Sequence, residues 1–145
     1  MSAGVCFKSE QRGWLQDQWS LVFSNFGITE IWERGCLDKR DAKIYQETID
    51  IDTAAELPVG RPLIVLAPVD GRYISGDQSL DEFVHPEGAI YLFGGSHANL
   101  NNEDDLGGRV PDASVYIPFV KYESYSHSAA YITLWDRYVK RGCFG

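Results

Sequence analysis

Ala89-Ile90-Tyr91-Leu92-Phe93-Gly94-Gly95 is the clearest structural signal in this sequence. Five apolar residues in a row are typical of a strand that is buried on both faces of a sheet, and the two glycines end it. A second strand of this kind is predicted at 63–67, before Pro68, and a third at 114–117, before Pro118. Strands that are buried on both faces belong to parallel sheets covered by helices.

Helical spacing is found on both sides of these strands. Apolar residues recur at three- and four-residue steps over 14–26 and again over 126–140. In the second helix the expected inward positions are Ala130, Ile132, Leu134, Trp135 and Tyr138. Shorter elements are predicted as strands at 4–7 and 29–32, an extended segment at 44–51, a capped helical turn at 52–57 and another turn at 80–83. The order predicts one α/β domain over residues 1–145, with a mainly parallel sheet.

Composition narrows the class of protein. The net charge of −8 argues against a nonspecific nucleic-acid binder, although an enzyme could still touch RNA at a local patch. Basic residues group at 39–43 and at 137–141, where solvated surface charge is the simpler expectation. No apolar run approaches the roughly 20 residues of a membrane span, and no signal peptide is recognisable. Three widely spaced cysteines favour a reducing, cytoplasmic compartment over a disulfide framework.

The strand ends predict where a ligand would bind. In a parallel sheet, ligands lie beyond the carboxyl ends of the strands, so Ala67, Gly94 and Ile117 should mark one pocket. No metal is expected there, because the histidines lie in separate segments without metal-ligand spacing. His97 and His127 sit in segments that would flank the pocket, where a base or a simple hydrogen-bonding role are the alternatives.

Three motifs in fixed order also carry a family resemblance. They are a strand ending in Phe-Gly (91–100, YLFGGSHANL), a strand ending in Ile-Pro (112–118, DASVYIP) and a serine-rich segment that opens an alanine-containing helix (123–131, ESYSHSAAY). Their order and spacing resemble the SpoU/TrmH-like branch of the SPOUT methyltransferases. The resemblance implies an α/β fold with a C-terminal trefoil knot, a homodimer, and S-adenosylmethionine as cofactor. It also implies methylation of a ribose 2′-hydroxyl in tRNA or rRNA.

The same resemblance implies a set of cofactor-binding residues at the strand ends and at the start of the last helix. They are Leu66, Ala67, Gly94, Gly95, Ile117, Pro118, Ser124, Tyr125 and Ser126. Apolar side chains here would wall an adenine slot, and glycine would allow close backbone approach. The homodimer would be formed through the first and last helices, which carry Trp14, Trp19, Trp135 and Tyr138.

The catalytic residues of the family are substituted in this chain. The arginine and asparagine of the first helix fall on Leu21 and Leu15, and a family glutamate falls on Ser96. Arg12 and Ser126 remain as candidate catalytic residues. Two hypotheses follow from these substitutions: an RNA 2′-O-methyltransferase with a rearranged site, or a catalytically inactive SPOUT-like protein that serves as a binding or structural component.

Overall fold

The computed structural model describes residues 2–9, 13–35, 44–66, 78–94, 106–118 and 125–142. Within them lie β1 (Gly4–Lys8), β2 (Glu30–Arg34), β3 (Ile49–Ile51), β4 (Leu63–Leu66), β5 (Gln78–Ser79), β6 (Ile90–Leu92) and β7 (Ala113–Tyr116). The two long helices are α1 (Gly13–Phe26) and α3 (Ser126–Arg141). The short 3-10 turns are η2 (Ala54–Glu56) and η3 (Leu80–Glu82).

The strands form a single sheet in the order β3-β2-β1-β6-β4-β7-β5. Every neighbouring pair is parallel. The expected α/β class and parallel sheet are therefore confirmed. The threading that defines a trefoil knot depends on segments outside the described residues, so the knot stays a prediction.

The central strands alternate between two apolar layers. Val5, Ile64 and Tyr91 face one layer, and the residues next to them in the chain face the other. Both sets are buried, because continuously apolar strands present a hydrophobic side chain to each face of the sheet. This is the pattern that the sequence predicts for 63–67 and 89–93.

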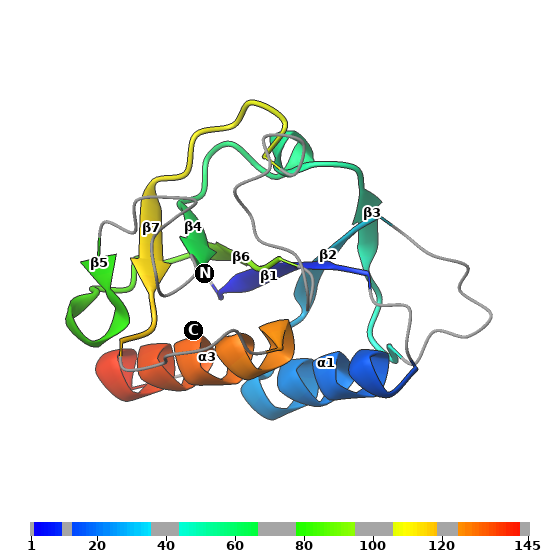
Figure 1. Cartoon of the computed structure of the whole chain (residues 1–145), viewed down its shortest axis with the longest axis horizontal. Coiled ribbons are helices and arrows are strands. Elements are labelled where there is room, and N and C mark those ends of the chain that lie inside the picture. Colours follow the sequence, from blue (N-terminus) through cyan, green and yellow to red (C-terminus); the bar gives the residue numbers. More distant parts are fainter. Residues whose placement is uncertain are drawn as a thin grey trace.

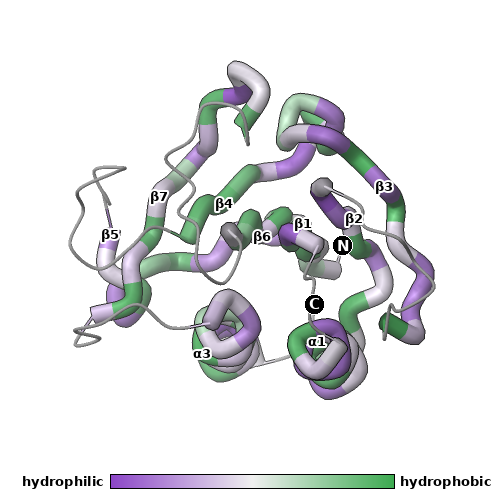
Figure 2. Tube along the Cα trace, turned by 45° about the vertical axis from the view of Figure 1, so that its right-hand side comes forward, coloured by the Kyte–Doolittle hydropathy of each residue, from purple (hydrophilic) through white to green (hydrophobic). Residues whose placement is uncertain are grey.

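One layer is built by the two long helices, which lie side by side against the same face of the sheet (Figures 1 and 2). Phe26 near the end of α1 packs on Tyr131 of α3, with ring centroids 5.7 Å apart. Trp19 of α1 reaches into the sheet and lies 5.0 Å from Phe7 of β1. Since Trp19 is fully buried in its own chain, it is not available to a dimer interface, contrary to the sequence-based expectation.

The buried stripe of α3 differs from the prediction. Ala130 and Leu134 are buried as expected, but Ile132 and Trp135 are 42% and 59% exposed. The other buried positions of α3 are polar, namely Ser126, His127, Thr133 and Arg137. Ser126 and Arg137 can occupy this stripe because they donate to acceptors on other segments, and Thr133 because it donates to the Ala129 carbonyl of its own helix.

The opposite face is covered by η2 and by residues around 106. Thr53 caps η2, and Glu56 returns a bond to the Thr53 backbone, which completes a capping box. The capped turn predicted at 52–57 is thus confirmed, while only 49–51 of the extended segment is a strand. The two-residue strand β5 was not predicted, and it lies at the sheet edge. Within the described ranges, no helix is long and apolar enough to cross a membrane.

Candidate functional site

The carboxyl ends of β6, β4 and β7 lie next to one another. Pairing of Val65 with Leu92, and of Leu66 with Val115, brings the three strands to almost the same level. We call the side of the sheet where the strands end, at Arg34, Leu66, Gly94 and Ile117, the carboxyl edge. Ligands of parallel sheets bind beyond such ends, where backbone groups are no longer paired within the sheet.

The first turn of α3 is fixed to the carboxyl edge. The Ser126 hydroxyl donates to the Gly94 carbonyl at 2.5 Å, and Ser126 is only 8% exposed. Tyr125 is the N-cap residue, and its side chain makes no capping bond. The unpaired N–H groups of a helix N-terminus carry a partial positive charge. This corner therefore combines a glycine, a fixed hydroxyl and a weakly positive helix end.

An aromatic group joins the starts of both long helices beside this corner. Tyr125 stacks on His127 with ring centroids 5.5 Å apart and planes 13° from parallel. The Trp14 ring meets both of them edge-on. His127 is 7% exposed, whereas Trp14 is 44% exposed. The arrangement provides an aromatic surface next to the carboxyl edge.

The sequence-predicted cofactor residues come together only partly within the described chain. Leu66 and Ile117 belong to the same apolar cluster. Gly94 and Ser126 are hydrogen-bonded to each other, and Tyr125 directly precedes Ser126. Pro118 follows Ile117 and is partly exposed. The remaining candidates lie outside the described residues, and they are Arg12, Ala67, Gly95 and Ser124.

The first helix carries no polar side chain at the two family positions. Leu15 is buried in the core, and Leu21 is 49% exposed. His97 and Ser96 lie outside the described residues. Within the described ranges, no group of three or more His, Cys, Asp or Glu residues could hold a metal ion.

Arg34 is a residue of this edge that sequence reasoning missed. Its Nη2 donates to the Phe93 carbonyl, and the side chain is 1% exposed. Arg34 ends β2, whereas Phe93 follows β6, and β1 lies between those strands. The charged pair Glu33-Arg34 directly after the apolar Ile31-Trp32 pair was the available signal, since charges there lie at a strand end.

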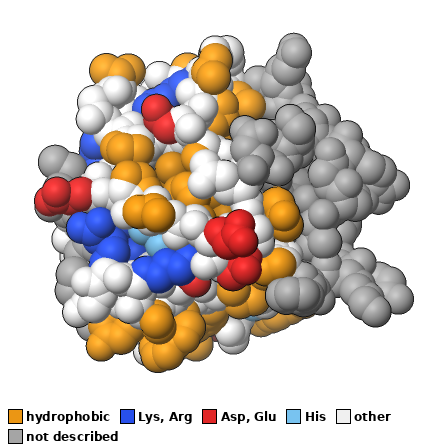
Figure 3. All heavy atoms as spheres, turned by 90° about the vertical axis from the view of Figure 1, so that its left-hand side faces the viewer, with side chains coloured by type: hydrophobic (Ala, Val, Ile, Leu, Met, Phe, Trp, Pro, Cys, Tyr) orange, Lys and Arg blue, Asp and Glu red, His pale blue; other side chains and the backbone are white. Residues whose placement is uncertain are grey.

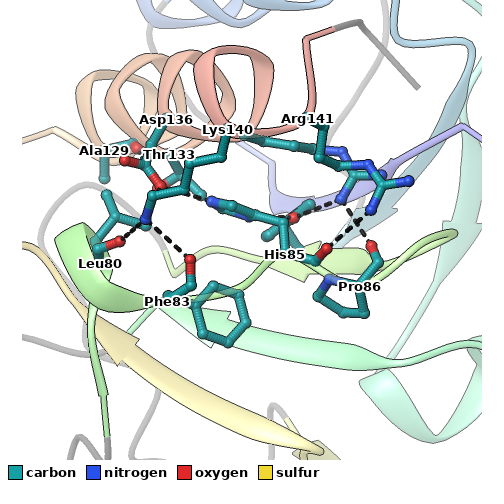
Figure 4. Close-up of polar contacts among 11 residues, drawn as sticks. Leu80, Phe83, His85, Pro86, Ala129, Thr133, Asp136, Lys140 and Arg141 are labelled. Atoms are coloured by element: carbon teal, nitrogen blue, oxygen red, sulfur yellow. Dashed lines mark hydrogen bonds and ion pairs between the residues drawn. The ribbon is translucent and has the colours of Figure 1, made fainter.

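The basic residues at the end of α3 make hydrogen bonds to other segments of the protein (Figure 4). Arg137 is 2% exposed, and its Nη1 donates to the Pro86 carbonyl and to the Tyr91 hydroxyl. Lys140 donates to the carbonyls of Leu80 and Phe83. The prediction of solvated surface charge is therefore wrong for Arg137, because Arg137 joins α3 to the segment around Pro86.

A directional chain of hydrogen bonds continues from Arg137. The Tyr91 hydroxyl accepts from Arg137 and lies 2.7 Å from His85 Nδ1, while His85 Nε2 lies 2.6 Å from an Asp136 carboxylate oxygen. Since Asp136 is an acceptor, His85 Nε2 carries the proton and Nδ1 accepts from Tyr91. Burial lowers the pKa of His85 although Asp136 opposes this effect, and burial raises the pKa of Tyr91 to about 12. The neutral forms of His85 and Tyr91 are consistent with these hydrogen bonds.

We predict a pH dependence of stability from His85. The unfolded chain gains a proton on this imidazole as the pH falls through about 6.5, but the folded chain, with a lower pKa, does not. The free energy of unfolding should therefore decrease below that pH, by at most about 1.4 kcal/mol per pH unit, until folded His85 also takes up a proton. Asp136, Lys140, Arg137 and Tyr91 are the groups that surround the ring.

Urea titrations between about pH 8 and pH 5.5 measure this dependence. A His85→Gln variant should show a shallower decrease than the parent chain over the same interval. Equal slopes in the two proteins would show that His85 does not cause the effect. The comparison with the variant also removes the contributions of other groups that titrate in this range.

The surface near β5 and the end of α3 shows no extended basic field among the described residues drawn there. Basic side chains form small groups interspersed with acidic and hydrophobic ones (Figure 3). Nucleic-acid surfaces need clustered Lys and Arg. This face is therefore a poor candidate for a broad RNA contact.

Comparison with solved structures identifies the fold. The chain superposes on a protein assigned to the TrmH family of RNA methyltransferases from Porphyromonas gingivalis, with a TM-score of 0.70 and 17% identity over 94% of this chain and 59% of that one. It superposes equally well on the SpoU methyltransferase AviRb from Streptomyces viridochromogenes in complex with AdoMet, with a TM-score of 0.71, 17% identity and coverage of 95% and 57%. The chain thus has the fold of the SpoU/TrmH methyltransferases, which confirms the resemblance at the level of fold.

A shorter neighbour matches over nearly its whole length. It comes from structural work on the 2-OH methylation of C/U34 on tRNA, and it matches with a TM-score of 0.70 and 18% identity over 97% of this chain and 91% of that one. This chain spans less than two thirds of the P. gingivalis and AviRb proteins. No protein-family model matches the chain, and no curated protein is similar enough to count as a relative.

Proposed function

We propose that this protein is an S-adenosylmethionine-dependent RNA methyltransferase that acts on a ribose 2′-hydroxyl of tRNA or rRNA. The observation that carries the proposal is the meeting of three parallel strand ends with the fixed first turn of α3 at Gly94. Two neighbours of the same fold add support, one bound to AdoMet and one described by 2-OH methylation of tRNA.

The residues of the carboxyl edge suit binding of such a cofactor. Leu66 and Ile117 offer apolar walls for a flat adenine ring, and Gly94 has no side chain to obstruct it. The Ser126 hydroxyl is engaged by the Gly94 carbonyl, so its role here is to hold the corner in place. Ala67, Gly95, Pro118, Ser124 and Tyr125 complete the proposed binding set.

The chemistry requires alignment and removal of one proton. When bound, S-adenosylmethionine supplies the methyl group. The protein must hold the ribose oxygen in line with that group and help the hydroxyl lose its proton. With leucine at both family positions of α1, we propose Arg12 as the replacement cation.

The alternative is a catalytically inactive protein of this fold that acts as a binding or structural component. Leu15 and Leu21 favour it, because neither can activate a hydroxyl. Titration calorimetry with S-adenosylmethionine tests the proposal first, and methyl transfer to bulk tRNA and rRNA separates the two hypotheses. Absence of heat at millimolar cofactor would refute a methyltransferase. Binding together with transfer of labelled methyl groups would exclude the inactive alternative.

Gly94→Val should abolish cofactor binding while the chain stays folded. The branched side chain would occupy the space that the adenine ring needs beside the Ser126 bond. We expect a loss of affinity of about 100-fold or more, since a clash removes most of the favourable contact. Gly60→Val is the matched control, because an added Cβ at Gly60 meets no atom within 4 Å. If Gly94→Val bound the cofactor as tightly as the parent, the site would be misplaced.

We also propose a homodimer in which the outer faces of α1 and α3 are covered. Trp14, Leu21, Trp135 and Val139 are 44 to 59% exposed on these two helices. Apolar side chains gathered on one face are typical of a protein contact. A monomeric mass at micromolar concentration in light scattering would contradict this proposal.

The cytoplasmic location likewise stays a prediction from the cysteine content.

A further inference from the structure

Arg34 is an unusual feature of the carboxyl edge because its guanidinium is buried and only partly satisfied. The side chain is 1% exposed, and Nη2 donates to the Phe93 carbonyl. In the part of the chain that the structure describes, Nε and Nη1 are buried without a hydrogen-bond partner. A buried charge with unsatisfied donors is costly unless an anion meets it.

The position of Arg34 places this charge beside the proposed cofactor site. Arg34 and Ser126 hold consecutive carbonyls of one strand end, those of Phe93 and Gly94. Lys8 of β1 is paired in register with Arg34, so two cationic residues lie on neighbouring strands at this edge. The first turn of α3, where the N-cap residue Tyr125 makes no side-chain capping bond, is fixed at the same strand end. The charges of Lys8 and Arg34 and the partial charge of the helix start each favour an anion at the carboxyl edge.

We propose that Arg34 binds an oxyanion of the ligand at the carboxyl edge, as a cationic contact separate from the one proposed for Arg12. This inference rests on the proposed function and deepens it. The oxyanion is either the carboxylate at the amino-acid end of the cofactor or a phosphate of the RNA. Burial of Arg34 favours a compact group on a small ligand. A guanidinium suits either oxyanion, because it forms directed, charge-assisted hydrogen bonds to carboxylate and to phosphate oxygens.

Calorimetry on the full chain distinguishes the two sources at constant ionic strength. S-adenosylhomocysteine carries the carboxylate, 5′-methylthioadenosine lacks it, and inorganic pyrophosphate presents phosphate oxygens alone. If the carboxylate is bound, Arg34→Met should lower the affinity for S-adenosylhomocysteine by about tenfold or more and leave the affinity for methylthioadenosine unchanged. If phosphate is bound, only the affinity for pyrophosphate should fall by this factor.

Two further variants keep the test decisive. Arg34→Lys retains the charge and should recover part of the affinity, and it replaces Arg34→Met if thermal melting shows that the methionine variant is unfolded. Arg61→Met is the matched control, because Arg61 is also an arginine with little exposure but pairs with Glu30 at the opposite end of β2.

The outcomes separate this inference from the proposed function. Unchanged affinity of Arg34→Met for all three probes would overturn the role of Arg34 and leave the methyltransferase proposal standing. No binding of S-adenosylhomocysteine by the parent chain would count against the proposed function. In that case the pyrophosphate measurement alone decides the role of Arg34, and it refutes that role if the parent and Arg34→Met behave alike.

Discussion

Replacing Trp19 by alanine is expected to lower the free energy of unfolding by about 3 to 5 kcal/mol. The Trp19 side chain is fully buried, and its ring lies 5.0 Å from Phe7, 5.7 Å from Phe23 and 5.7 Å from Phe93 between centroids. The contacts with Phe7 and Phe93 join α1 to β1 and to the end of β6. Alanine leaves a cavity that the surrounding aromatic rings cannot fill, so both transfer and packing energy are lost.

Urea denaturation of the parent and of two variants tests this expectation. Tyr45→Ala serves as the control, since the Tyr45 side chain is 83% exposed and its removal should change stability by about 0.5 kcal/mol or less. A Trp19→Ala variant as stable as Tyr45→Ala would mean that α1 does not pack on the sheet through this residue.

Arg137→Ala is the second substitution with a large expected effect, about 3 kcal/mol or more. Removal of the guanidinium leaves the Pro86 carbonyl and the buried Tyr91 hydroxyl without the hydrogen bonds that Arg137 donates to them. These two bonds from α3 are lost together with the packing of the long side chain.

The matched control for Arg137 lies four residues further along the same helix. Arg141 donates to the His85 carbonyl at 3.0 Å but is exposed, so Arg141→Ala should cost about 1 kcal/mol or less. Thermal melts of both variants provide the comparison. If Arg137→Ala melted at the temperature of Arg141→Ala, the hydrogen-bond chain through Tyr91 would not contribute to stability.

Much of the sheet could be predicted from sequence because the signal is local. Leu63 to Leu66 and Ile90 to Leu92 are continuously apolar, and this pattern alone indicates strands buried on both faces. Their carboxyl ends then indicate a binding edge through the geometry of parallel sheets. The order of the strands is not local, and it decides which residues meet at that edge.

Two buried arginines, Arg137 and Arg34, could not be predicted from local sequence patterns. The inward stripe of α3 includes Arg137, which periodicity treats as polar and exposed, because its partners Pro86 and Tyr91 come from distant parts of the chain. Arg34 was overlooked for a related reason. Its partner Phe93 lies two strands away in the sheet, and nothing near Arg34 in sequence reveals that β6 lies beside β1.

The place of β6 in the sheet also has a consequence for how the chain reaches its native state. β6 lies between β1 and β4 in the sheet. The half formed by β1, β2 and β3 can therefore join the half formed by β4, β7 and β5 only after β6 has formed, when Gly4 pairs with Ile90. Contacts between residues so far apart in sequence slow folding, because loop-closure entropy is lost before the pairing is gained. During synthesis, β1 and β2 must leave the ribosome as an incomplete sheet with an open edge, and the centre of the domain is completed only when β6 inserts.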